Sequence, residues 1–147
     1  MRIVVQRVKN ASVEVDGKIT GSIDNGLLLL VGFTTGDNLE KINYMVNKVI
    51  NLRIFDDNNG VMNLSVKDIG GSILSVSQFT LYGDATKGNR PSYINALKGE
   101  ESIKLYEEFN KKLSEVIHTE TGIFGADMKI QLVNNGPVTI LIDSKNR

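Results

Sequence analysis

Two segments of the sequence carry residue types that could do chemistry. Residues 77–81, SQFTL, place two hydroxyls and an amide beside apolar side chains, just before a stretch that contains glycine. Sites often lie at such strand ends, where loops on a rigid scaffold bind the ligand. Residues 134–139, NNGPVT, join the backbone freedom of glycine to the fixed φ of proline. The structural alternatives are an ordinary strand end for the first segment and a tight turn between two strands for the second.

The composition removes the usual catalytic side chains. The 147 residues include no cysteine, which excludes a thiol nucleophile and disulfides. The one histidine, His118, disfavours a Ser/His/Asp triad and a multi-histidine metal site. It follows the apolar stripe of a predicted helix, where we expect a capping or surface role. Asp56 and Asp57 precede residues 58–60, NNG, which is a turn sequence. We therefore expect no metal and no cofactor.

Charge and hydropathy limit the partners. The 17 Lys and Arg residues balance the 17 Asp and Glu residues, so no chain-wide basic field exists to hold long nucleic acid, and we expect no DNA partner. A small contact with a nucleic-acid end is compatible with this balance. No apolar stretch approaches the roughly 20 residues of a membrane helix, since the run 27–31 ends at Gly32. We expect a soluble, cytoplasmic protein that does not contact a membrane.

The elements that must position the two segments follow from hydrophobic periodicity. The expected strands of the first quarter are residues 2–9, 12–15, 18–23 and 27–33, with a hairpin turn at Asp16-Gly17. The last of them is apolar throughout, as in a strand buried on both faces. Helical spacing predicts one helix over residues 39–52, with Asp37 as its N-cap, and a second over residues 101–117.

The remaining patterns complete one α+β domain over residues 1–147. A strand is predicted over residues 72–81, with Gln78 and Thr80 on the face opposite Phe79. Two closing strands, 128–133 and 138–142, flank the Gly-Pro pair. Residues 83–92 lack periodicity and form a polar surface loop. No repeat, low-complexity tract or linker interrupts the chain.

The segments taken together are far more specific than each alone. Their order along the chain is SQFTL, KGNRPS at residues 87–92, TGIFGADM at residues 121–128 and NNGPVT, after an opening MRIVVQRV. This order closely resembles the D-aminoacyl-tRNA deacylases, the D-tyrosyl-tRNA deacylase family, over the whole chain. One departure is Asn135, where the family commonly has Asp; asparagine keeps the turn chemistry but lacks the charge.

The resemblance implies a homodimer of compact, β-rich, barrel-like subunits with two main helices. It implies hydrolysis of the ester that joins a D-amino acid to the 3′ end of tRNA, and of glycyl-tRNA mischarged on a non-cognate tRNA. The family motif maps its active site to Ser77, Gln78, Phe79 and Thr80. Gly136 and Pro137 match a Gly-Pro segment with a cis peptide, whose carbonyls reach into the partner's pocket and exclude L side chains. A rigid main-chain wall discriminates through repulsion.

Two mechanisms are open for the ester cleavage. The Thr80 hydroxyl could attack as a nucleophile, but the motif holds no histidine or lysine to take its proton. Alternatively, backbone amides around Phe79 and Thr80 stabilise the oxyanion, while the ribose 2′-OH helps to activate or position water. We favour the second mechanism, because an aminoacyl ester is already labile. Two other functions compete with a deacylase: a tRNA-end binding module without turnover, and a hydrolase that edits tRNA mischarged with a small residue.

Four further residues are weaker candidates. Lys87 and Arg90 in the polar loop are expected to contact phosphates, while the terminal adenine stacks. Phe124 is expected to be a pocket wall, with core packing as the alternative. Arg7 is expected to donate hydrogen bonds to carbonyls of the Gly-Pro segment, with an exposed strand charge as an equal alternative.

Overall fold

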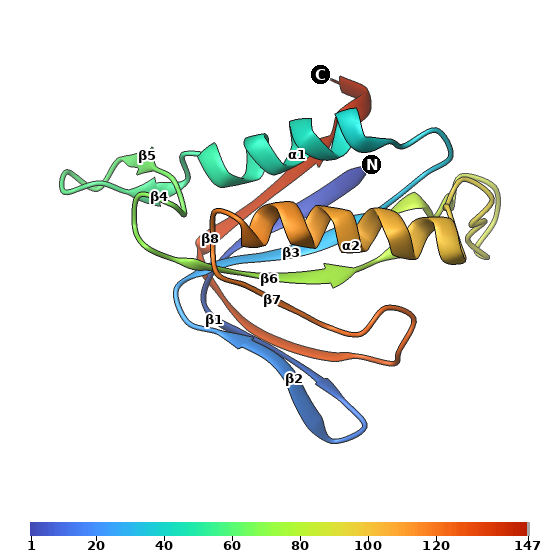
Figure 1. The fold of residues 1–147 in the computed structure, drawn as a ribbon, viewed down its shortest axis with the longest axis horizontal. Coiled ribbons are helices and arrows are strands. Elements are labelled where there is room, and N and C mark those ends of the chain that lie inside the picture. Colours follow the sequence, from blue (N-terminus) through green and yellow to red (C-terminus); the bar gives the residue numbers. More distant parts are fainter. Residues whose placement is uncertain (147) are drawn as a thin grey trace.

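The computed structural model describes residues 1–146. Its fold is organised around the apolar strand at residues 26–32, which is buried on both faces. The strands are β1 (Arg2–Val15), β2 (Lys18–Ile23), β3 (Gly26–Gly32), β4 (Phe55–Asp56), β5 (Met62–Leu64), β6 (Ser72–Ser77), β7 (Thr119–Thr121) and β8 (Lys129–Asp143). The helices are α1 (Leu39–Asn51) and α2 (Glu100–Ser114), with two 3-10 turns, η1 (Phe79–Tyr82) and η2 (Ser144–Asn146). Both α-helices lie on one side of the sheet (Figure 1).

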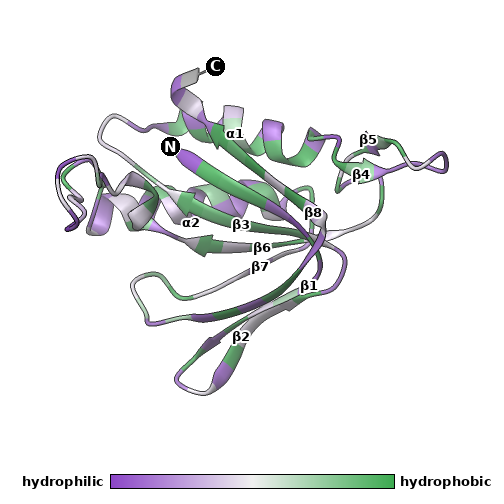
Figure 2. Ribbon diagram, turned by 180° about the vertical axis from the view of Figure 1, so that it is seen from behind, coloured by the Kyte–Doolittle hydropathy of each residue, from purple (hydrophilic) through white to green (hydrophobic). Residues whose placement is uncertain are grey.

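The apolar run of β3 is explained by two hydrophobic clusters, one on each face of the sheet. Leu27, Leu29 and Val31 face the helices, in a cluster that includes Phe109 of α2. Leu28 faces the other cluster, which the curved part of the sheet encloses. Figure 2 shows β3 coloured as hydrophobic along most of its length. Burial on both faces removes the alternation that a half-exposed strand would show.

The main sheet runs in the order β2-β1-β3-β6-β7, and β8 lies outside this order because it pairs with β1. The first half of β1 pairs with β3 and the second half with β2, while β8 pairs with β1 from Arg2 to Glu14. β3 and β7 run parallel to β6, whereas β2, β3 and β8 run antiparallel to β1. The two ends of this path approach each other, because a Cβ on Gly21 of β2 would lie 2.8 Å from the carbonyl oxygen of Thr121 in β7. The sheet is therefore nearly closed, which confirms the barrel-like α+β fold with two main helices.

The first and last strands are longer than the sequence patterns predicted. β1 is one strand of 14 residues, where two short strands were expected, and β8 is one strand of 15 residues that continues through NNGPVT. The two strands pair from Arg2 with Asp143 to Glu14 with Lys129. Register shifts between Gln6 and Asn10 absorb the irregular residues without ending either strand. The prediction of a tight turn at the Gly-Pro pair is wrong.

Element ends account for the other differences. Asn38 caps α1 by accepting from the Lys41 amide (3.0 Å), whereas Asp37 accepts from the Thr34 amide (2.8 Å) and pairs with the Met1 ammonium (2.7 Å). The strand predicted over residues 72–81 ends at Ser77. The three-residue strand β7 was not predicted. Within residues 1–146, no helix is long and apolar enough to cross a membrane.

Candidate active site

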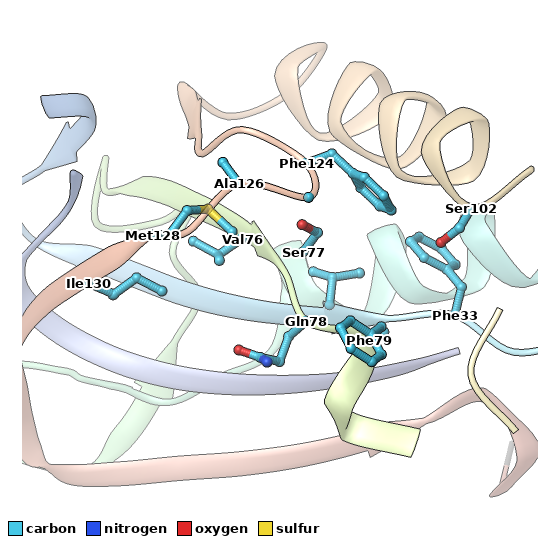
Figure 3. Close-up of a pocket in the computed structure, with 13 residues that line it drawn as sticks. Phe33, Val76, Ser77, Gln78, Phe79, Ser102, Phe124, Ala126, Met128 and Ile130 are labelled. Carbon is cyan, nitrogen blue, oxygen red and sulfur yellow. The ribbon is translucent and has the colours of Figure 1, made fainter. Parts of the chain in front are cut away.

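A pocket of about 280 Å³ opens where the parallel strands β3 and β6 end at the same edge of the sheet. It lies between these strand ends, the start of α2 and the loop between β7 and β8 (Figure 3). The lining residues are Val31, Gly32, Phe33, Val76, Ser77, Gln78, Phe79, Ser102, Phe124, Gly125, Ala126, Met128 and Ile130. Its size is just below the range of small-molecule sites, which run from about 300 to 1,000 Å³. It suits an acyl group better than a whole nucleotide.

The backbone at the end of β6 is tightly held and then turns. The Gln78 amide donates to the Val31 carbonyl oxygen (2.7 Å), and the chain continues as η1 with the Leu81 amide donating to the Gln78 carbonyl oxygen (3.2 Å). Gly32 permits the close approach of the two strand ends, because a Cβ on Gly32 would lie 2.9 Å from the Gln78 carbonyl oxygen. The amides of Phe79 and Thr80 find no acceptor among residues 1–146. Two consecutive N–H donors are thus free beside the pocket.

The four residues of the SQFT motif have different positions. Ser77, Gln78 and Phe79 line the pocket, whereas Thr80 does not. Ser77 and Gln78 extend to opposite sides of the strand end, with the Ser77 hydroxyl directed toward the loop that carries Phe124 (Figure 3). The Gln78 side-chain amide donates to the Thr80 hydroxyl oxygen. This bond occupies a lone pair of the hydroxyl and supplies no base for its proton.

The described residues that line the pocket include no ionisable side chain. His118 does not line it; its side chain is 68% exposed, and its Nε2 lies 3.1 Å from Glu120. Asp57 accepts from the amides of Asn59 (2.8 Å) and Val61 (3.1 Å), as expected of a turn residue. The described part of the chain holds no group of three or more metal-ligating side chains.

Sequence reasoning missed the roles of two polar residues on α2, of which only Ser102 lines the pocket. Ser102 is buried and lines the pocket. Tyr106, one turn further on, donates from its hydroxyl to the Ser75 carbonyl oxygen of β6 (2.7 Å), and its ring centre lies 5.8 Å from that of Phe124. Burial raises the pKa of Tyr106, so its hydroxyl stays a donor. The available signal was a serine and a tyrosine on a helix face otherwise made of apolar residues.

The Gly-Pro segment lies on β8 and outside this chain's own pocket. Gly136 and Pro137 are exposed, and Gly136 has a φ of +117°. Arg7 is buried and donates from Nε to the Asn135 carbonyl oxygen (3.0 Å) and from Nη1 to the Ile54 carbonyl oxygen (2.7 Å). Arg7 is therefore not an exposed strand charge but donates a hydrogen bond to a backbone carbonyl of this segment.

The peptide bond between Gly136 and Pro137 is trans, because residues 1–146 contain no cis peptide. The cis bond implied by the family resemblance is therefore wrong for this structure. The physical reason is that the pair lies within β8, whose extended course on both sides continues through a trans bond.

The weaker candidates divide into two groups. Phe124 lines the pocket and also packs against the main hydrophobic cluster, so its two alternatives are compatible. Lys87 and Arg90 are exposed on the loop after η1 and do not line the pocket.

An apolar pocket with free backbone amides at its rim is suited to the hydrolysis of an activated acyl ester. The family model for D-Tyr-tRNA(Tyr) deacylase matches residues 4–143, and the chain belongs to this family. It is a D-aminoacyl-tRNA deacylase and thus a hydrolase.

Two solved structures are similar over nearly the whole chain. One, described as c-Myc DNA Unwinding Element Binding Protein, superposes with a TM-score of 0.92 at 38% identity, covering 97% of this chain and 98% of its own. The other, described as a probable eukaryotic D-amino acid tRNA deacylase, has a TM-score of 0.82 at 16% identity, covering 96% and 97%. The second similarity supports the fold.

Proposed function

We propose that the pocket binds the aminoacyl group of D-aminoacyl-tRNA, and of glycyl-tRNA mischarged on a non-cognate tRNA, and releases the free amino acid and tRNA. The observation that carries this proposal is the pair of free amides, Phe79 and Thr80, at the rim of a pocket whose described lining lacks ionisable side chains. Such a site stabilises developing negative charge through fixed dipoles. The substrate places the reaction in the cytoplasm, where tRNA is used.

In the proposed mechanism, water attacks the ester carbonyl carbon and the carbonyl oxygen becomes an oxyanion. The amides of Phe79 and Thr80 donate to this oxyanion, and the tRNA 2′-OH positions the water. The C–O bond to the ribose then breaks, the ribose oxygen takes a proton, and the acid loses one to solvent. One preorganised donor is worth about 3 kcal/mol, so two account for much of the acceleration of a labile ester.

The proposal gives Thr80 a supporting role. Its hydroxyl accepts from the Gln78 side chain, and no base lies in the motif to activate it. Ser77 and Gln78 line the site from opposite sides of the strand end, and the Ser77 hydroxyl is directed toward the loop that carries Phe124.

Discrimination between D and L substrates is assigned to Gly136 and Pro137 of a partner subunit. This segment is exposed, rigid at proline and anchored through Arg7, yet it does not line the pocket of its own chain. A homodimer would bring it to the other subunit's pocket. Exposed apolar side chains on β8, Val133 (47%) and Leu141 (66%), support such an interface.

The test compares hydrolysis of D-Tyr-tRNA, L-Tyr-tRNA and Gly-tRNA by the purified protein. We expect D-Tyr-tRNA to be preferred over L-Tyr-tRNA by about a thousandfold, which corresponds to about 4 kcal/mol of barrier difference. Binding without release would favour the tRNA-end binding module. A rate on Gly-tRNA far above that on D-Tyr-tRNA would favour the hydrolase that edits small residues.

The chain's other proline provides a control for the wall. Pro137→Gly releases the fixed φ, and we expect the D/L preference to fall by tenfold or more, about 1.4 kcal/mol. Pro91→Gly, in the surface loop, should leave the preference unchanged. An unchanged preference in Pro137→Gly, or a monomer in light scattering, would contradict the cross-subunit arrangement.

A further inference from the structure

A pair of aromatic rings stands at the rim of the pocket. Phe79 lines the pocket but keeps 44% of its surface exposed. The Tyr93 ring meets it edge to face, with ring centres 5.3 Å apart and planes at 69°. The exposed Phe79 ring and the half-buried Tyr93 ring beside an apolar pocket provide a surface on which a nucleobase can stack.

A cation is held over the same two rings. The Lys98 ammonium lies 5.4 Å from the centre of the Phe79 ring and 5.8 Å from that of Tyr93. The acidic residue closest to it in sequence, Glu100, pairs instead with Lys104 (3.9 Å). No carboxylate within residues 1–146 lies at ion-pair distance from Lys98. Its charge is thus available to an anion from outside the chain.

The segment that carries Lys98 is fixed to the site. The Leu97 amide donates to the carbonyl oxygen of Phe33 (2.9 Å), which follows β3 and lines the pocket. The Thr34 hydroxyl donates to the Asn95 carbonyl oxygen. Two hydrogen bonds therefore hold this segment against the end of β3. Lys87 and Arg90 differ in this respect, because their loop is closed on itself by the two backbone hydrogen bonds between Asp84 and Ser92 (2.8 Å each).

We propose that Lys98 binds a phosphate of the single-stranded 3′ end of tRNA, while a base of that end packs against Phe79 and Tyr93. This inference rests on the proposed function, because the aminoacyl group must occupy the adjacent pocket. The pocket's small volume leaves the nucleotides outside it, at the rim where the rings and the ammonium lie. Single-stranded RNA is bound through this combination of stacking and backbone charge.

The test measures kcat and KM with D-Tyr-tRNA and with D-tyrosyl-adenosine, which has the same ester but no phosphate. For Lys98→Ala we expect KM for D-Tyr-tRNA to rise about fivefold with kcat unchanged. The slope of log KM against log salt concentration should fall by the amount of about one phosphate contact. KM for D-tyrosyl-adenosine should stay within about twofold, since the lost contact is to a phosphate. Lys98→Arg should restore KM. Lys104→Ala is the matched control and should leave both substrates unchanged.

A binding experiment separates this inference from the proposed function. It uses an uncharged RNA hairpin that ends in single-stranded CCA, with a DNA hairpin of the same sequence beside it. RNA binding that depends on Lys98 without hydrolysis of D-Tyr-tRNA would overturn the proposed function and support the phosphate contact. An unchanged KM in Lys98→Ala, or an equal effect on D-tyrosyl-adenosine, would each overturn the inference. An equal Lys98 dependence with the DNA hairpin would support it, because the phosphate and the base faces are common to RNA and DNA. A protein that neither binds nor hydrolyses would overturn both.

Discussion

Gly136→Ala tests how the Gly-Pro segment is anchored. Gly136 has a φ of +117°, where L side chains are rare, and a Cβ there would be well inside contact distance of Arg7 Nη2. Arg7 cannot simply move away, because it is buried and donates to the carbonyl oxygens of Asn135 (3.0 Å) and Ile54 (2.7 Å). The substitution therefore combines backbone strain with displacement of a buried guanidinium.

The magnitude follows from these two contributions. The strained φ costs of order 1–2 kcal/mol for a residue with a side chain. Loss of one charge-assisted hydrogen bond of Arg7 adds about 1.5–3 kcal/mol. We expect Gly136→Ala to lower the free energy of unfolding by about 3–4 kcal/mol. Gly60→Ala is the control, since its φ is +72° and no atom lies within 4 Å of the added Cβ. It should cost about 1 kcal/mol.

Urea unfolding at equal protein concentration measures both variants. In an Arg7→Ala background the contact disappears, so Gly136→Ala should cost only its backbone strain, and the double-mutant cycle should show a coupling of about 1.5 kcal/mol or more. The reasoning is refuted if Gly136→Ala and Gly60→Ala lower the stability by the same amount, or if the cycle shows no coupling between Arg7 and Gly136.

Three further outcomes are expected. Thr80→Ala should keep substantial deacylation in a single-turnover assay; a complete loss with intact fold and binding would favour the nucleophile mechanism. Tyr106→Phe removes the hydrogen bond that holds β6 at Ser75, two residues before Ser77, and should cost about 1 kcal/mol of stability. If this bond positions the SQFT motif, kcat should fall more than KM changes; an unchanged kcat would contradict such a role. Amides of Val61 and Asn59 lower the pKa of Asp57 below 3.8, so this carboxylate stabilises the fold above that pH and the contribution is lost as pH falls through the lowered pKa. Asp57→Asn should therefore weaken the dependence of Tm on pH below about 4. A dependence of Tm on pH equal to that of the unsubstituted protein in this range would count against the assignment.

Much of the fold was accessible from local patterns. The apolar run of β3 and the helical spacing of α1 and α2 were predicted because burial imposes periodicity on the sequence. The continuity of β1 and β8 was not, because their irregular centres are tolerated only through pairing with each other. A long-range partner of this kind leaves no local signal.

The site was predictable only where its residues belong to a sequence motif. Ser77, Gln78, Phe79 and Phe124 came from motifs and lie together in the pocket. Ser102 and Lys98 were missed, because only the docking of α2 and the segment before it brings them to the strand ends. Their positions are set by tertiary contacts such as the hydrogen bond from Leu97 to Phe33.

The pairing of β1 with β8 constrains how the protein is made. Arg2 pairs with Asp143 and Glu14 with Lys129, so one edge of β1 waits for residues translated more than a hundred positions later. A nascent chain still lacking β8 exposes that edge, and unpaired strand edges favour association with other chains. The pairing of β1 with β8 can form only after β8 has left the ribosome. Folding of the complete domain thus waits for β8, and truncation within β8 should leave this edge of β1 unpaired.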